Sequence, residues 1–522
     1  MQTQKISTDF NKKFFGIIVI FSFLVFLATA DGHRMTFDED VANQESVRIA
    51  TMTPDSNYVQ GESRLFFEYP VLFPPETNQR PICKNGILCS ASNIGHSFSQ
   101  VPFMMFFNTF PIFDSADIFE NDDFNDPNYV YWRNNLDSEF VFLDIFYGPI
   151  LSSLSMGIFY LITREFRFSN NSSLIVTLLY GFSTLTWAYS QTTLNSVPSM
   201  LFILLGVLFF LKFYFRSNNK FIFLSTMSLG FGFLVRPDVG IVIAVIFGLF
   251  LFKLFKTNSK IFHIISFTFP LFGFFIFRRI ITESRFEHSF PLVTGIPADY
   301  PTSITEGISG LLFSPGIGLF IFVPILLMSF LSFQDFFKIE KKICISFIVI
   351  SIIFIVFYAR LEDWHGLVAW GPRYLFPIIP FLLIPLGASL DKRRHKLFIM
   401  LIILLGVSGI FINLIYVSQD VSWFVWGQQG NENGLYALGR MADGNVYHLW
   451  INPIVLYTFE YSQLSHAIIW AFTNFQSDVF LFELLGWKIY CAIFLPSTAF
   501  TIFCLLRLSR KHNKDLIVHS AS

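Results

Sequence analysis

The strongest constraint on the fold is a series of apolar runs, each about long enough to cross a lipid bilayer. Crossing a hydrocarbon core of about 30 Å takes roughly 20 helical residues, and about twelve runs reach that length. Backbone groups inside lipid must hydrogen-bond within their own segment, so each run is predicted to be a helix. The predicted helices begin near Phe14, Val141, Ser173, Val197, Phe221, Val239, Ile261, Ile308, Ile343, Tyr374, Leu397 and Lys488.

Composition supports this interpretation. Of the 522 residues, 53% are hydrophobic and only 14% are charged, which excludes an ordinary soluble domain. We therefore predict an all-α polytopic membrane protein with about twelve transmembrane helices. The net charge of -1 gives no field that would attract nucleic acid. Sequence motifs of nucleotide-binding loops are absent, so nucleotide chemistry and nucleic-acid partners are not expected.

The basic residues predict the orientation in the plasma membrane. They gather in alternate connections, which the positive-inside rule places in the cytoplasm together with both termini. These residues are Lys12, Lys13, Arg164, Arg167, Lys212, Arg216, Lys220, Lys253, Lys256, Lys260, Lys338, Lys341, Lys342, Lys392, Arg393, Arg394, Lys396, Arg507, Arg510 and Lys511. A competing interpretation makes the first run a cleaved signal peptide, because Ala28-Thr29-Ala30 resembles a cleavage site.

The opposite side carries the long polar segments. The first outer loop covers about 31–140, and inside it the apolar stretch 101–107 is too short to span, which predicts short interfacial or re-entrant helices. We divide the chain into a transmembrane catalytic region (1–416), an extracytoplasmic loop of unknown role (417–487), and a last transmembrane helix with a basic cytoplasmic tail (488–522).

An acidic stretch directly follows the first predicted helix on the outer side. Asp38, Glu39 and Asp40 lie there, and ionisable residues at the membrane face are functional candidates because they are costly to place. In an extended segment, neighbouring side chains point to opposite faces, so one acid of the Asp38-Glu39 pair would act while the other orients or faces away. Alternatively, the stretch only caps a following helix.

Two arginines on the outer side are candidates for anion binding. Arg373 stands at the entrance of a proline-interrupted apolar run, and its guanidinium offers a planar fork of donors to phosphate oxygens. The alternative is an interfacial anchor beside Tyr374. Arg236 lies in a tight turn with Pro237 and Asp238, where an ion pair that closes the turn is the simpler explanation.

Two cysteines, Cys83 and Cys89, lie close together in the first outer loop. In an oxidising compartment they would form a disulfide, and the alternative is a pair of free thiols. A zinc site is disfavoured because no second ligand pair accompanies them. We predict no metal ligands, and any requirement for a divalent metal is left open.

Four segments together resemble the GT-C fold membrane glycosyltransferases, particularly the polyprenyl-phosphate-sugar-dependent protein mannosyltransferases and the lipid A aminoarabinose transferase. Asp38-Glu39 looks like the acidic motif of their first outer loop. The stretches 95–103 (Gly-His-Ser-Phe-Ser-Gln-Val-Pro-Phe), 312–320 (Leu-Phe-Ser-Pro-Gly-Ile-Gly-Leu-Phe) and 371–377 (Gly-Pro-Arg-Tyr-Leu-Phe-Pro) resemble further family motifs in the same order. Asp40 is a departure, since it supplies a third nearby acid.

The resemblance implies a GT-C-like hexosyltransferase of the EC 2.4 class that works outside the cell. The donor would be a sugar on polyprenyl phosphate, the acceptor a protein, lipid or glycan, and the transfer inverting. Asp38 would be the catalytic base and Glu39 its partner, with Asp40 and Tyr374 in support. Arg373, helped by His365 or Arg236, would bind the donor phosphate. A transporter or lipid flippase, or a non-catalytic scaffold, remains as an alternative, although the chain shows no related halves.

Overall fold

The computed structural model describes most of the chain. The described residues are 2–34, 37–52, 93–109, 138–255, 260–285, 303–361, 364–366, 369–392, 395–419, 436–440, 446–451, 456–460, 462–473, 475 and 477–521. The expected Cys83–Cys89 disulfide lies outside these residues.

Among the described residues, eight helical segments are long and apolar enough to cross a membrane. They are α1 (Gln2–Ala28), α6 (Ser138–Glu165), α9 (Ser196–Arg216), α12 (Lys260–Arg285), α16 (Lys341–Tyr358), the 3₁₀ turn η1 (Arg373–Ile378) with α17 (Ile379–Lys392), α18 (Lys396–Ser418) and α22 (Phe480–Ala521). Three shorter apolar helices are α10 (Asn219–Val235), α11 (Val239–Leu254) and α13 (Ile304–Phe313). The prediction of an all-α polytopic membrane protein is confirmed.

The remaining elements are short. They comprise the helices α2 (Phe37–Thr51), α4 (Ile94–Thr109), α7 (Asn170–Phe182), α8 (Thr186–Tyr189), α14 (Leu319–Phe322), α15 (Leu326–Ile339) and α21 (Gln463–Thr473), and the antiparallel strands β1 (Tyr436–Arg440) and β2 (Val446–Ile451). Both α2 and α4 belong to the first outer loop, and α4 contains the apolar stretch 101–107. The prediction of short helices in that loop is thus confirmed.

The transmembrane helix predicted to begin near Ile308 is not one continuous helix. The run that begins near Ile308 is divided into α13, α14 and α15. The first break falls at Ser314-Pro315-Gly316 and the second at Val323-Pro324. Proline has no N–H for the helical hydrogen bond and its ring clashes with the preceding turn, so two prolines within ten residues end the helix twice.

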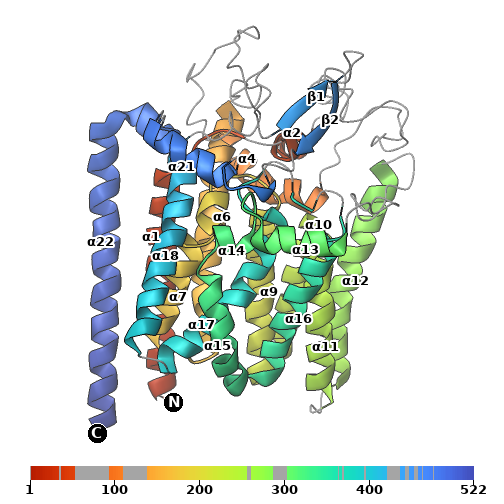
Figure 1. The fold of residues 1–522 in the computed structure, drawn as a ribbon. Helices are drawn as coiled ribbons and strands as arrows, with labels where there is room; N and C mark the ends of the chain where they lie inside the picture. The colour runs from red at the N-terminus through yellow and green to blue at the C-terminus, as the bar shows by residue number, and fades with distance from the viewer. Residues whose placement is uncertain are drawn as a thin grey trace.

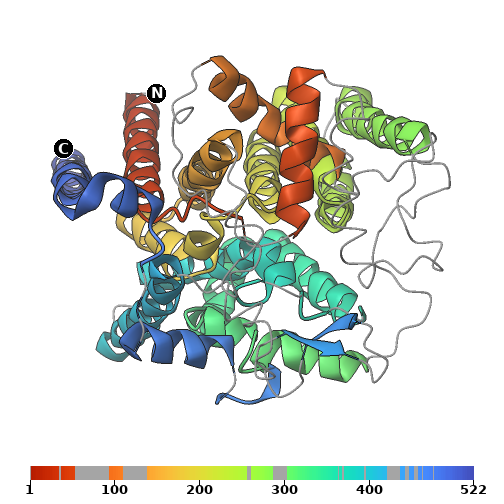
Figure 2. The same ribbon diagram turned by 90° about the horizontal axis from the view of Figure 1, so that it is seen from above.

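The helices form a bundle whose outer surface is apolar. Phe262 and Phe272 of α12 are 68% and 63% exposed, which suits a surface in contact with lipid rather than water. Helix α22 lies at the edge of the bundle beside α1 (Figure 2). Its Tyr490 hydroxyl donates a hydrogen bond to the Ala28 carbonyl over 2.5 Å.

Both chain termini lie at one end of the bundle (Figure 1). Polar contacts join helix ends there: the Ser172 hydroxyl donates to Asp391 over 2.6 Å, and Lys392 pairs with Asp335 over 2.9 Å. Arg164 donates to the side chain of Asn11, near the N-terminus. Arg164 and Lys392, which the sequence assigns to cytoplasmic connections, therefore lie at the end of the bundle that holds both termini.

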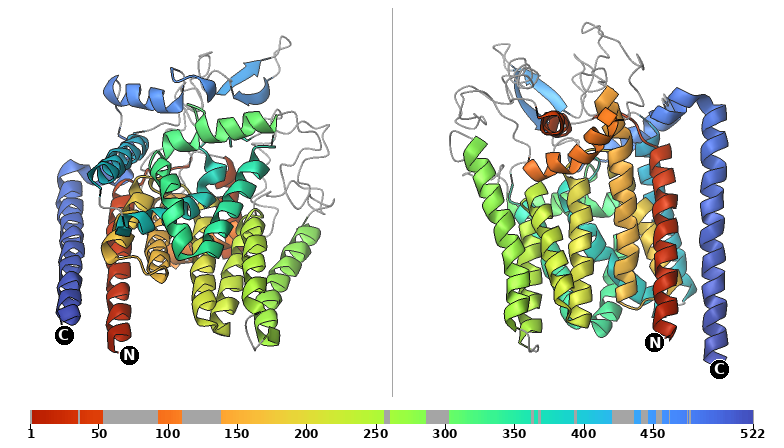
Figure 3. Two further views of the ribbon diagram at one scale, coloured as in Figure 1. Left: turned by 60° about the horizontal axis from the view of Figure 1, so that its bottom comes forward. Right: turned by 180° about the vertical axis from the view of Figure 1, so that it is seen from behind.

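The opposite end is covered by α2, α4, α13, α21 and the β1–β2 pair (Figure 1). Seen from behind, α2 and α4 lie across the ends of the long helices (Figure 3). Gly95, at the start of α4, packs so closely on the last turn of α10 that an added Cβ would stand 2.5 Å from the Leu234 carbonyl carbon. The polar side chains described below all belong to this end.

Gly148 of α6 is predicted to be intolerant of any side chain. A Cβ there would overlap the backbone carbonyl of Ser190 and stand 2.9 Å from the Thr192 oxygen. Because these are backbone atoms of a buried connection, we expect Gly148→Ala to destabilise the protein by about 3 kcal/mol. Thermal unfolding in detergent measures the loss.

The matched control is Gly273→Ala in α12, where an added Cβ meets nothing within 4 Å. This change should leave the protein unaffected or stabilise it by up to about 1 kcal/mol, because alanine favours helix over glycine. Equal melting temperatures for the two variants would contradict the close packing at Gly148.

Candidate active site

The site is built around a buried polar connection, residues 183–195, which joins α7 to α9 and contains α8. Backbone without regular hydrogen bonding is tolerated at membrane depth only where protein surrounds it. The amide of Gln191 donates to the carbonyl of Thr29 and, over 3.2 Å, to that of Val417. Tyr189 donates to the carbonyl of Trp370 over 3.2 Å. The connection thus holds the ends of α1 and α18 and the loop before η1.

The acidic stretch starts helix α2 and is not extended, so the premise for separating Asp38 from Glu39 was wrong. Consecutive side chains in a helix still diverge, by about 100°. Glu39 is only 1% exposed, and its carboxylate accepts the backbone N–H of Thr193 over 2.8 Å. Glu39 therefore fastens the first turn of α2 to the 183–195 connection. Negatively charged residues in the first turn also stabilise a helix through its dipole. The side chains of Asp38 and Asp40 lie outside the described part of the structure.

The 95–103 motif forms the body of α4. The His96 ring donates from Nε2 to the Thr193 carbonyl over 2.6 Å, so both backbone groups of Thr193 are used. One turn on, the amide of Gln100 donates to the Asn43 side chain over 2.8 Å. This second contact ties α4 to α2 directly.

A buried ion pair joins the segment after α1 to α6. Arg34 Nε lies 3.6 Å from Asp144 Oδ2, and the two side chains are 2% and 1% exposed. The Arg34 guanidinium also stands 4.5 Å above the ring of Phe140. Asn43 of α2 donates to the other Asp144 oxygen over 3.4 Å. Asp144 thereby gathers contacts from two outer segments onto one membrane helix.

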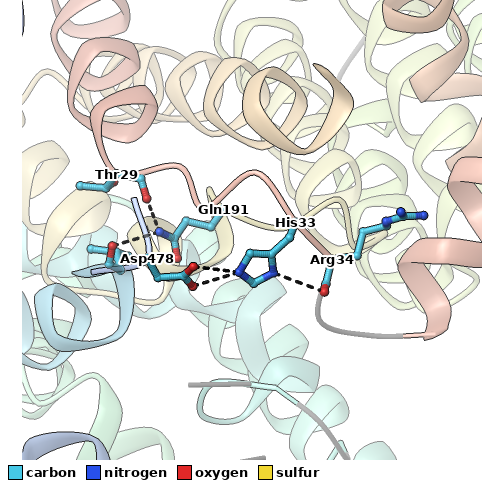
Figure 4. Close-up of polar contacts among 6 residues, drawn as sticks. Thr29, His33, Arg34, Gln191 and Asp478 are labelled. Atoms are coloured by element: carbon cyan, nitrogen blue, oxygen red, sulfur yellow. Dashed lines mark hydrogen bonds and ion pairs between the residues drawn. The ribbon is translucent and has the colours of Figure 1, made fainter. Parts of the chain in front are cut away.

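Next to this pair lies a second buried cluster (Figure 4). His33 Nε2 stands 3.0 Å from both carboxylate oxygens of Asp478, while its Nδ1 faces the Arg34 carbonyl at 3.4 Å. Asp31 completes the cluster. Burial raises the pKa of Asp31 well above its usual value; His33 opposes this rise, and the carboxylates of Asp478, Asp144 and Glu39 add to it.

The three candidates for phosphate binding are brought into one neighbourhood. Arg236 donates to Asp238 over 2.5 Å and to the Tyr358 hydroxyl over 2.9 Å, so the predicted ion pair that closes this turn exists. The Tyr358 ring stacks on Tyr374, with centroids 4.4 Å apart, and the Arg373 guanidinium stands 5.2 Å from the Tyr374 ring centre. The two guanidinium groups are close enough for the positive charge of Arg373 to oppose that of Arg236.

His365 lies in the same neighbourhood, in the loop before η1. Burial, and secondarily the nearby Arg373 charge, lowers the pKa of His365 to about 4. At neutral pH its ring is therefore uncharged and offers one N–H donor. The adjacent Gly366 has a φ of +76°, and a Cβ there would stand 2.9 Å from Arg373 Cγ, so glycine makes room for the arginine.

The sequence interpretation missed several members of this end. Asp144 is an acid inside an apolar helix, a signal that marks functional candidates. The run of hydroxyl and amide side chains in 183–195, between two apolar helices, is another such signal. Nothing in the sequence pairs His33 with Asp478, which lies 445 positions away.

The 312–320 motif contacts the outer segment that precedes and begins α21. Ser314 donates to the Leu456 carbonyl over 2.5 Å, which also accepts the Gly316 N–H over 3.0 Å. Gln463 donates to the Gly316 carbonyl over 2.7 Å. The motif therefore anchors the 456–463 part of the outer loop whose role the sequence left open.

Comparison with known proteins supports the resemblance noted in the sequence. Residues 143–282 match the family model of dolichyl-phosphate-mannose-protein mannosyltransferase. This range covers most of α6, most of α12 and everything between them, including the 183–195 connection. A search of curated proteins finds no match. Among solved structures, the apo crystal structure of ArnT from Cupriavidus metallidurans is similar, with a TM-score of 0.47 and 12% identity over 95% of this chain and 75% of that chain. The family match confirms the resemblance of this chain to the GT-C fold membrane glycosyltransferases.

Proposed function

We propose that this chain is a membrane glycosyltransferase that moves a sugar from polyprenyl phosphate to an acceptor hydroxyl on the extracytoplasmic face. The proposal rests on one observation: an acidic segment and a group of phosphate-binding candidates lie at the same end of the bundle. The acidic start of α2 is fastened there through Glu39 and Thr193, and Arg373 lies beside His365 and Arg236. The family match over residues 143–282 supports this class of activity.

The side of the membrane follows from charge. Basic residues gather at the end that holds both termini, and the positive-inside rule assigns that end to the cytoplasm. The acidic start of α2 then faces outward. Nucleotide sugars are made in the cytoplasm, whereas a lipid-linked sugar can be presented at the outer face, which favours the polyprenyl-phosphate donor.

The roles in the transfer follow from the chemistry of each group. The acceptor oxygen forms a bond to the anomeric carbon while the bond from that carbon to the phosphate oxygen breaks, which inverts the configuration. Asp38 takes the acceptor proton, a task for a carboxylate within hydrogen-bond reach of the hydroxyl. Glu39 positions the first turn of α2, because its own carboxylate is occupied by the Thr193 N–H.

Arg373 is the leading group for the phosphate. Arg236 is buried and donates to both Asp238 and Tyr358, and His365 is uncharged at neutral pH because its pKa is lowered to about 4. Arg373 is half-buried and its guanidinium lies beside Tyr374. It would stabilise the charge that builds on the departing polyprenyl phosphate, with His365 donating an N–H.

Turnover of a defined donor tests the proposal. Membranes that contain the chain should release polyprenyl phosphate from a radiolabelled polyprenyl-phosphate sugar and place the label on protein, lipid or glycan. Fractionating the labelled products identifies the acceptor class. Donor binding without turnover would support the scaffold alternative, and neither binding nor turnover across a set of lipid-linked sugars would refute the proposal.

Arg373→Ala is expected to lower kcat/KM for the donor by about 100-fold, because one preorganised donor to a developing anion contributes that order of rate. Arg373→Lys keeps the charge but loses the planar fork, so it should recover only part of the rate. The matched control is Arg279→Ala, which breaks an exposed pair with Glu283. Unchanged kinetics for Arg373→Ala would move the phosphate site elsewhere.

A further inference from the structure

Three potential metal ligands converge from both ends of the chain. Asp31 and His33 lie in the connection between α1 and α2, and Asp478 lies just before α22. One carboxylate oxygen from each aspartate and a ring nitrogen of His33 all lie within 4.8 Å of one another. Each residue is only 5% exposed. Figure 4 shows the Asp478 carboxylate turned toward the His33 ring.

The spacing of the donor atoms suits one bound cation. His33 Nε2 is 3.0 Å from each oxygen of Asp478. Two ligands that bind the same cation at about 2.0–2.2 Å stand roughly 3 Å apart when adjacent. His33 Nδ1 faces the Arg34 carbonyl, which only accepts, so Nδ1 carries a proton. A cation bound between Nε2 and the Asp478 carboxylate would take the place of the Nε2 proton that otherwise joins them. Metal-binding histidines commonly make such a second contact to a backbone carbonyl.

Asp31 provides a second, independent observation that points to a bound ion. Its Oδ1 is buried and has no hydrogen-bond partner among the residues that the structure describes. A buried carboxylate oxygen without a partner is costly. Asp478, Asp144 and Glu39 add negative charge nearby. A dipositive ion would offset this excess.

We propose that Asp31, His33 and Asp478 bind one divalent cation of the zinc or manganese class. One imidazole with two carboxylates suits these ions, whereas calcium and magnesium prefer oxygen ligands alone and soft ions prefer thiolates. The remaining coordination positions belong to water. This assignment is independent of the sugar transfer.

The cation would fasten the segment between α1 and α2 to the start of α22. The backbone already makes part of this junction, since the Phe480 N–H donates to the Ala30 carbonyl over 3.0 Å and the Asp478 N–H to that of Ser418 over 3.4 Å. Closing a loop of this length in the unfolded chain costs entropy, so a bound ion stabilises the fold. It also fixes the segment that leads into the acidic start of α2.

Metal content and thermal stability test the site. The full-length protein, purified in detergent and stripped with EDTA, is titrated separately with ZnCl2 and MnCl2. We expect about one tightly held ion per chain by mass spectrometry. We also expect a rise in melting temperature on the order of 5 °C at saturation. Failure of both ions to bind stoichiometrically would overturn the proposal.

Asp31→Asn is the decisive variant because it should fold without the metal. It keeps the shape of the side chain and removes a carboxyl group whose buried Oδ1 lacks a hydrogen-bond partner in the described structure, so the stripped variant should melt no lower than the stripped wild type. It should nevertheless lose the bound ion and the metal-dependent rise. Asp335→Asn, at the opposite end of the bundle, should retain both. A metal response shared by Asp31→Asn and the wild type would show that the ion binds elsewhere.

Discussion

Asp38→Asn is expected to lower the rate of sugar transfer by roughly 100- to 10,000-fold, the range that a positioned general base contributes. Asparagine keeps the size of the side chain, but it cannot take the acceptor proton. The rate is measured in membranes as transfer of radiolabelled sugar from a polyprenyl-phosphate sugar. The amount of folded protein should stay at the wild-type level.

Two companion variants decide which acid carries the chemistry. Asp40→Asn distinguishes the two candidates, since a large loss there with full activity in Asp38→Asn would transfer the role of base to Asp40. Glu39→Gln keeps an oxygen for the Thr193 N–H, so it should lose much less rate than Asp38→Asn. Glu283→Gln removes an exposed carboxylate at the end of α12 and controls for charge alone. Full activity in all three acidic-stretch variants would place the base elsewhere.

The membrane architecture was predictable because lipid leaves few alternatives. An apolar run of the right length must become a helix, so eight of the twelve predicted starts coincide with candidate spans. Of the other four, the runs near Phe221 and Val239 form the shorter apolar helices α10 and α11, and the remaining two have local causes. The prolines at 315 and 324 divide the run near Ile308, and the helix that begins near Ser173 ends at Phe182, where the polar 183–195 connection follows.

The candidate site was only partly predictable, since its contacts join distant residues. Arg236 and Arg373 could be selected from the sequence as ionisable groups near the membrane face. Their shared neighbourhood, created by the Tyr358–Tyr374 stack, could not. The role of Glu39 depends on the backbone of Thr193, which has no sequence signature. Periodicity describes which face of a helix is apolar, and it does not say which polar groups meet across 150 or 450 positions.

Asp144→Ala is expected to destabilise the protein by about 3–5 kcal/mol, the second large effect. Removing one member of a buried ion pair is strongly destabilising because the other charge loses a compensating partner. Here that charge is Arg34, whose side chain is 2% exposed, and Asn43 loses its contact with Asp144 as well. The thermal midpoint in detergent should fall by several degrees.

The double variant Arg34→Met with Asp144→Leu removes both charges at once, and it thereby distinguishes loss of the ion pair from the cost of leaving one charge behind. Replacing both members of a buried pair by apolar residues is often neutral or stabilising, so the double variant should recover most of the stability that Asp144→Ala loses. A double-mutant cycle with the single variants Arg34→Met and Asp144→Leu gives the coupling energy. Additive effects would show that the two side chains do not stabilise each other. Loss of sugar transfer in the recovered double variant would show that the pair also positions α2, because the path from Asp144 through Asn43 reaches that helix.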